Sequence, residues 1–146
     1  MTALQKIRTW LATFPGYDRL RSMKVDYYSA EPDNGSIAPS GLTEISRKED
    51  VLGNLTVTKQ YNFGLYYVFT KADEDDEGAT QNAEWLIQLQ EWVHEQGILG
   101  LAPVFGDDPK TEEIKAQNGT IQGLSEGTAM YMVQLSVKFI KKYEVT

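Results

Sequence analysis

The chain has 146 residues, of which 41% are hydrophobic, and a formal net charge of −7. This length suits a single domain over residues 1–146, and the hydrophobic fraction is ordinary for a soluble globular protein. The sequence contains no cysteine, which excludes disulfides, thiolate catalysis and cysteine-ligated metal sites. We find neither a signal peptide nor an apolar run of the ~20 residues that a membrane span needs. We therefore expect synthesis in the cytoplasm and no membrane partner.

Acidic residues are concentrated in the middle of the chain. Residues 73–113 contain 12 acidic residues and one basic residue, whereas the remainder contains 9 acidic and 13 basic residues. Such a balance is poorly suited to binding nucleic-acid phosphates. It suits a surface that has to repel them.

The first predicted helix begins after Thr2. Thr2 and Gln5 match a capping box, in which the two side chains satisfy free backbone N–H groups at the helix start. A single apolar stripe follows at helical spacing, made of Ala3, Leu4, Ile7, Trp10, Leu11 and Phe14. Pro15-Gly16 ends the helix, which we interpret as packed on the core. A short strand is predicted over 23–29.

Turn-forming residues dominate the next part of the chain. Residues 30–41 predict a long loop. Residues 42–51 are compatible with an extended arm or an edge strand, and Gly53-Asn54 predicts a turn. Residues 55–71 then alternate apolar and polar side chains, which is typical of a half-buried strand.

A run of five carboxylates precedes the second helix: Asp73, Glu74, Asp75, Asp76 and Glu77. They repel one another and resist burial, and the N-terminus of a helix favours negative charge. We interpret the run as a solvated loop and helix start. A divalent-metal site is the alternative, but consecutive acids lack the alternating spacing of an EF-hand loop. The sequence therefore predicts no metal ligands.

The second helix is predicted from about Thr80 to Gln96, with Gly97 as the residue that ends it. Its buried face is predicted to contain Trp85, Leu86, Leu89, Trp92 and Val93. Ile87 lies alone on the opposite, polar side. An isolated apolar side chain on a polar face is common, and a subunit contact is the alternative interpretation of Ile87.

The last third of the chain predicts β-structure. An irregular apolar loop over 98–108 is followed by Asn118-Gly119, whose flanking segments predict a β-hairpin. Gly127 introduces a closing strand over 129–143, which we expect to pair with residues 55–71. One face of the closing strand is apolar and consists of Tyr131, Val133, Leu135, Val137 and Phe139.

These elements predict an α+β fold. We expect an antiparallel sheet of four to five strands, with two amphipathic helices packed on one face. Two such long half-apolar strands need a cover, and the helices can supply it.

Motifs for catalysis are weak. Gly123-Leu-Ser125-Glu-Gly127 fits the G-x-S-x-G pattern of serine hydrolases, which requires a strand before the serine and a helix after it. Here a strand is predicted to follow. His94, the single histidine, is interpreted as a surface residue, and it precedes the serine. The sequence predicts no catalytic residue and no cofactor.

The order of the elements resembles that of the phage tail terminator, or tail completion, family. The closing strand of that family typically runs from a glycine through a tyrosine and alternating aliphatic residues to an aromatic, as Gly127, Tyr131, Leu135 and Phe139 do here. The chain is also similar to small minor capsid proteins encoded in prophages of Gram-positive bacteria. The likeness covers residues 1–143, although the segment 30–51 is longer than the family core.

The resemblance implies a structural virion protein without catalysis, made in the bacterial host cytoplasm. It would form a homo-oligomeric ring, usually a hexamer, that caps the phage tail tube protein and meets the head–tail connector protein. DNA would pass through the lumen without specific binding. We expect some of residues 73–77 to line or rim that channel, since carboxylates repel phosphates. The alternatives are a head-completion or connector adaptor, and a small acyl- or nucleotide-handling enzyme.

Overall fold

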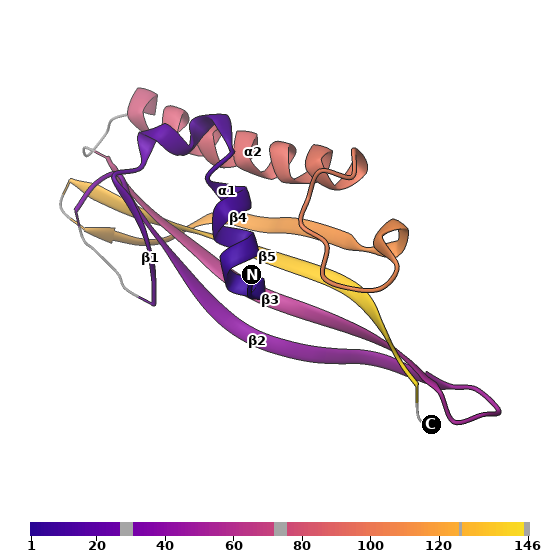
Figure 1. Cartoon of the computed structure of the whole chain (residues 1–146). Coiled ribbons are helices and arrows are strands. Elements are labelled where there is room, and N and C mark those ends of the chain that lie inside the picture. Colours follow the sequence, from indigo (N-terminus) through magenta and orange to yellow (C-terminus); the bar gives the residue numbers. More distant parts are fainter. Residues whose placement is uncertain (27–30, 72–75, 126, 145–146) are drawn as a thin grey trace.

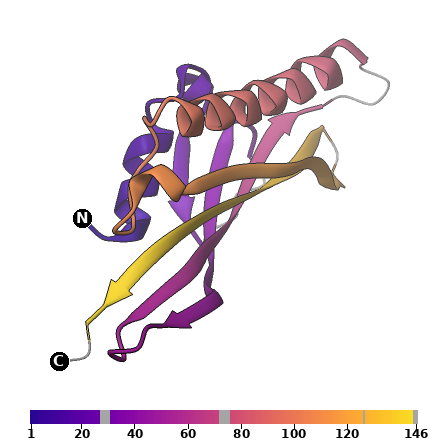
Figure 2. The same ribbon diagram turned by 90° about the vertical axis from the view of Figure 1, so that its right-hand side faces the viewer.

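The fold is one sheet with helices on one side (Figure 1). The computed structural model describes residues 1–26, 31–71, 76–125 and 127–144. In chain order, the elements are α1 (Ala3–Leu11), the 3₁₀ helix η1 (Pro15–Arg19), β1 (Ser22–Val25), β2 (Asn34–Glu49), β3 (Leu55–Thr70), α2 (Asp76–Ile98), the 3₁₀ helix η2 (Pro109–Thr111), β4 (Glu113–Ser125) and β5 (Thr128–Tyr143). The strand order is β1-β2-β3-β5-β4. Figure 2 shows α2 and α1 on the same side of this sheet.

The predicted α+β class is confirmed, but the sheet is mixed and not purely antiparallel. β1 pairs with β2 in parallel, whereas the other three strand pairs are antiparallel. Hydrogen bonds extend this short parallel ladder at both ends. The Arg21 N–H donates to the Asp33 carbonyl at 2.6 Å, and the Asp26 N–H donates to the Ile37 carbonyl at 3.0 Å.

The pairing of β3 with β5 confirms the central prediction. These two strands of 16 residues each pair from Leu55 and Tyr143 at one end to Thr70 and Thr128 at the other. Every second residue of β5 from Ala129 to Phe139 is buried. The period-2 pattern therefore reports the side of the sheet that faces the helices.

The predicted loop over 30–41 is wrong, because most of it belongs to β2. Residues 34–49 form one strand of 16 residues, which resolves residues 42–51 as an extended arm. The pairing register shifts between Pro39 and Gly41 and again between Glu44 and Ser46. These bulges accommodate residues that do not fit a regular strand. Pro39 lies beyond the end of β1, where its missing N–H is not needed by a neighbouring strand.

The predicted hairpin at Asn118-Gly119 is also wrong. Gln117 pairs with Gln134 and Thr120 pairs with Met132, so both segments face β5 and the Asn-Gly pair forms a bulge between them. Asn118 has a φ of 60°. The bulge thus uses the same positive-φ tolerance that a hairpin turn would use.

The capping of α1 confirms the sequence prediction. The Thr2 N–H donates to Gln5 Oε1 at 2.8 Å, and the Gln5 N–H donates to Thr2 Oγ1 at 3.2 Å. Ile7, Trp10 and Leu11 are buried against the sheet. The reciprocal cap fixes where the helix begins, and its apolar stripe fixes which side faces the core.

α2 ends later than predicted, because Gly97 lies inside the helix. Gly100, with a φ of 71°, is the residue that terminates it. The Leu101 N–H donates to the Gln96 carbonyl at 2.9 Å, which is the six-to-one bond of a Schellman motif. No helix among the described residues is long and apolar enough to cross a membrane.

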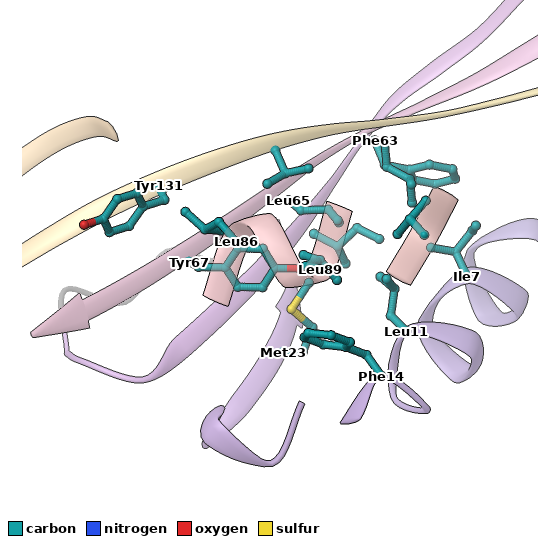
Figure 3. Packing of buried hydrophobic residues seen from close by; sticks show 14 of the residues in the cluster. Ile7, Leu11, Phe14, Met23, Phe63, Leu65, Tyr67, Leu86, Leu89 and Tyr131 are labelled. Carbon is teal, nitrogen blue, oxygen red and sulfur yellow. The ribbon is translucent and has the colours of Figure 1, made fainter. Parts of the chain in front are cut away.

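Figure 3 shows part of the buried core, including Leu86 and Leu89 of α2. Trp85 of the same helix belongs to this core. Its ring centroid lies 5.5 Å from that of Phe14, 4.9 Å from that of Tyr67 and 5.0 Å from that of Phe69. Its Nε1–H donates to the Gly16 carbonyl at 2.9 Å. Trp85 therefore joins α2 to the sheet and to the segment between α1 and η1.

Truncation of Trp85 tests this role. We expect Trp85→Ala to lower the free energy of unfolding by about 3–5 kcal/mol, because it removes a large buried ring and leaves a cavity. The matched control is Ile87→Ala, two residues along the same helix, whose side chain is 52% exposed. Urea unfolding followed by fluorescence and circular dichroism measures both. A loss below ~1 kcal/mol for Trp85→Ala would show that the core does not depend on this ring.

Candidate interaction surfaces

The outer side of α2 forms an acidic surface. Of the predicted channel residues, Asp73, Glu74 and Asp75 lie outside the described residues, whereas Asp76 and Glu77 are exposed in the first turn of α2. The acidic helix surface consists of Asp76, Glu77, Glu84, Glu91 and Glu95, all of them exposed. The sequence of α2 contains neither lysine nor arginine. Ile87 is exposed on the same helix.

The sheet face turned away from the helices is polar, and Glu113 forms ion pairs with Lys115 and Lys138 at one end of it. The face contains a groove of about 260 Å³ whose polar lining includes Gln60, Asn62, Tyr66, Gln117, Gln134 and Ser136. The amides bond one another: Gln60 Nε2 donates to Asn62 Oδ1 at 2.8 Å, and Asn118 Nδ2 donates to Gln134 Oε1 at 2.7 Å. Among the described residues that line the groove, none carries a charged side chain. This face suits contact with a surface, not acid–base chemistry.

An arm built on β2 and β3 extends past the helical layer, and the end of β5 adds a third strand beside β3 (Figure 1). The arm consists of residues 41–49 of β2, the turn 50–54 and the facing residues 55–62 of β3. Every residue from Gly41 to Glu49 is exposed. The last residues of β5 run beside β3, and Lys59 Nζ donates to the Tyr143 hydroxyl. The arm is held by strand pairing and receives little support from the core.

Residues 99–112 support the arm through the end of β5, where Ile140 and Lys142 pair with residues 58 and 56 of β3. Gly106 lies so close to β5 that an added Cβ would be 2.3 Å from the Ile140 carbonyl oxygen. The Asp107 N–H donates to the Ile140 carbonyl and the Lys142 N–H donates to Asp107 Oδ2, both at 2.8 Å. The Glu112 carboxylate accepts the N–H groups of Phe105 and Gly106. Asp107 and Glu112 are thus used in backbone hydrogen bonds.

The tip of the arm is a hydrogen-bonded turn that presents two aliphatic side chains. Asp50 Oδ1 accepts the N–H groups of Leu52 and Asn54, each at 2.9 Å. The Asp50 N–H donates to the Asn54 carbonyl at 3.0 Å, and Gly53 adopts a φ of 86°. Val51 is fully exposed and Leu52 is 74% exposed. The turn therefore fixes two apolar side chains in solvent.

A second apolar feature, the α1 groove, lies at the base of the arm. It has a volume of about 190 Å³ and is lined by Ala3, Leu4, Pro39, Leu42, Tyr61 and Phe63, with Gly41 and Asn62. α1 supplies one wall, and β2 and β3 supply the other. The register shift between Pro39 and Gly41 lies at this groove, so the bulge helps to shape it.

Two groups inside the fold, Arg19 and Tyr67, have pKa values that are shifted by their surroundings. Partial burial lowers the pKa of Arg19, although the Asp33 carboxylate opposes this. Its guanidinium donates to Asn82 Oδ1 at 2.6 Å, and Asn82 Nδ2 donates to the Thr70 carbonyl at 3.0 Å. Burial raises the pKa of the Tyr67 hydroxyl above its usual range. These groups tie η1 and α2 to the sheet.

The structure offers no support for the motifs of catalysis or metal binding that the sequence raises. Ser125 ends β4 and Thr128 begins β5, so a strand follows the G-x-S-x-G motif in place of the required helix. Among the described residues, no three histidine or acidic side chains are grouped so as to hold a metal ion. No model of a known protein family matches the chain, and no curated protein matches it either.

The hydrogen bonds of the Asp50 carboxylate predict that the turn at the arm tip depends on pH. Backbone N–H donation from Asn54, with further hydrogen bonds from Leu52, the Asn54 amide and Gly53, holds the pKa of the Asp50 carboxyl below its usual range. Because the folded pKa is lowered, the turn is stabilised above the unfolded value of about 3.9 and loses that stabilisation as the pH falls through the folded pKa.

In an NMR titration, we expect the Leu52 and Asn54 amide resonances to shift with a midpoint below about 3.9. The control is Asp50→Asn, which should lack this titration. A midpoint at or above the ordinary aspartate value would contradict the hydrogen-bonded turn.

Proposed function

We propose that this chain is a structural virion protein of a phage or prophage, a tail terminator that closes the end of the tail tube as a ring and joins it to the head connector. The arm carries this proposal. It projects beyond the core, residues 99–112 support it through the end of β5, and it ends in exposed aliphatic side chains at Val51 and Leu52. A projection of this kind has contacts to gain only from another molecule.

The distribution of apolar surface supports self-assembly. The arm tip and the α1 groove are different features at different places on the chain, so a contact between them is head-to-tail. Such heterologous contacts form closed rings when the rotation between subunits closes. A ring on a tail tube requires a contact of this type.

The distribution of charge supports a path for DNA. The acidic helix surface carries five exposed carboxylates, and α2 contains neither lysine nor arginine. Facing a lumen, it would repel phosphates and prevent DNA from adhering. The uncharged groove of the sheet face and the arm would then be available for contacts between proteins.

Disruption of the coding sequence in the phage or prophage that carries it tests the function. We expect particles whose tails are overlong or unfinished, because nothing stops tube growth, and rescue by the wild-type chain supplied in trans. Electron microscopy of the particles provides the measurement. Tails of normal length beside unjoined heads would instead identify a head-completion adaptor. Unaltered, infectious particles would exclude a virion role.

The acidic run provides a second test within the same particles. Replacing Asp73, Glu74, Asp75, Asp76 and Glu77 by Asn or Gln should impair DNA passage or docking while leaving the fold intact. The measured quantities are infectious titre and DNA ejection from complete particles. The control replaces the exposed Asp18 by Asn and Glu144 by Gln, away from the run. Full infectivity of the five-fold variant would rule out a channel role for these carboxylates.

A further inference from the structure

The arm tip has the properties of a pre-organised binding element. Val51 and Leu52 are exposed, and the turn that holds them is closed by Asp50 and Asn54 through backbone and side-chain hydrogen bonds. A turn fixed in this way loses little conformational freedom on binding, so burying its two side chains yields more net affinity than a flexible loop would.

The α1 groove offers a matching apolar site. Its volume of about 190 Å³ exceeds that of the ~150 Å³ apolar cavities that accept a benzene molecule. The Leu4, Leu42 and Phe63 side chains make its lining aliphatic and aromatic. The groove can therefore receive branched aliphatic side chains, and the exclusion of water from both partners would drive the contact.

The tip cannot reach the groove of its own chain. Leu42 lines the groove and Leu52 lies ten residues further along the same arm. Strand pairing with β3 keeps β2 extended up to Glu49, which places the tip roughly 25–30 Å from the groove at ~3.3 Å per residue. A tip that is seated in an α1 groove must therefore belong to another molecule.

We propose that the arm tip of one copy inserts Val51 and Leu52 into the α1 groove of the next copy. The proposal rests on the ring-forming function above and names the contact that closes the ring. It joins each copy to two neighbours, one through its tip and one through its groove. The contact joins two different surfaces, so it can propagate from copy to copy until a ring closes, whereas a reciprocal exchange of tips between two copies would close a dimer.

Cysteine pairing tests the contact directly, because the natural chain contains no cysteine. Leu52→Cys protein is mixed with Ala3→Cys protein at the highest soluble concentration and oxidised with diamide. A disulfide requires Cα atoms within about 7 Å, so a 52-to-3 product reports seating of the tip in the groove beside α1. The double variant Leu52→Cys/Ala3→Cys should give a ladder of covalent oligomers that ends in a closed species.

Competing contacts are tested in the same way. Ser46→Cys lies on the exposed edge of the arm, and its pairing with itself would indicate edge-to-edge association of two arms. Ile87→Cys lies on α2, and its pairing with Leu52→Cys would indicate docking of the tip on that helix. Either of these products in place of the 52-to-3 product would overturn the proposal. So would the absence of all cross-linking.

A second measurement needs no cysteine. The variant Val51→Ser/Leu52→Ser should weaken self-association by about 100-fold or more, because two aliphatic side chains no longer leave water. The matched control is Ile98→Ser/Leu99→Ser, which alters two exposed aliphatic residues at the C-terminal end of α2. Both variants should keep the wild-type circular dichroism spectrum. Sedimentation equilibrium gives the constants, and equal effects of the two variants would contradict the proposal.

The experiments distinguish a wrong contact from a wrong function. If 52-to-3 products form but disruption of the coding sequence leaves tails and heads normal, the contact stands and the tail-terminator function is wrong. If tails become overlong but no 52-to-3 product forms, the function stands and the ring closes through another surface.

Discussion

The structure depends on a difference in length between the strands and the helices that cover them. β3 and β5 pair over 16 residues, which at ~3.4 Å per residue corresponds to roughly 54 Å. α2, with 23 residues at ~1.5 Å each, is about 35 Å long, and α1 is much shorter. The helical layer therefore cannot cover the whole sheet. Trp85 anchors it over one half, and the loop around Gly106 extends the cover as far as Val57 and Phe139. What remains uncovered is the β2 side of the arm and its tip, residues 41–52, all of which are exposed.

The sequence revealed the elements whose side chains follow one period. β3, β5 and both helices are predictable because each has one face against a single core, and burial imposes alternation or a stripe. The errors lie where local residue preferences compete with pairing. Pro39 and Gly41 favour a turn, and Asn118-Gly119 favours a hairpin. In both cases a long neighbouring strand offers more backbone hydrogen bonds than a local turn, and a bulge accommodates the exception.

The interaction surfaces were only partly predictable, for a related reason. The acidic character of α2 is visible in the sequence, as is the exposure of Ile87. Val51-Leu52 between Asp50 and Gly53 is a signal that could have been used, since two aliphatic residues inside a turn are exposed on any fold. The α1 groove could not have been found, because its walls come from residues 3–4, 39–42 and 61–63. Only the pairing of β2 with β3 and the placement of α1 bring these segments together.

The same constraint bears on how a ring of these chains would acquire its size. The proposed tip and groove belong to one continuous β-ladder, so their relative direction is fixed by the twist of β2 and β3 between them. The register shifts at Pro39/Gly41 and at Glu44/Ser46 bend that ladder at two points. The rotation from one copy to the next would then depend on the arm together with the placement of α1, which forms the other wall of the groove. The turn-forming residues of the segment 34–49 are therefore one part of the sequence in which subunit number would be encoded.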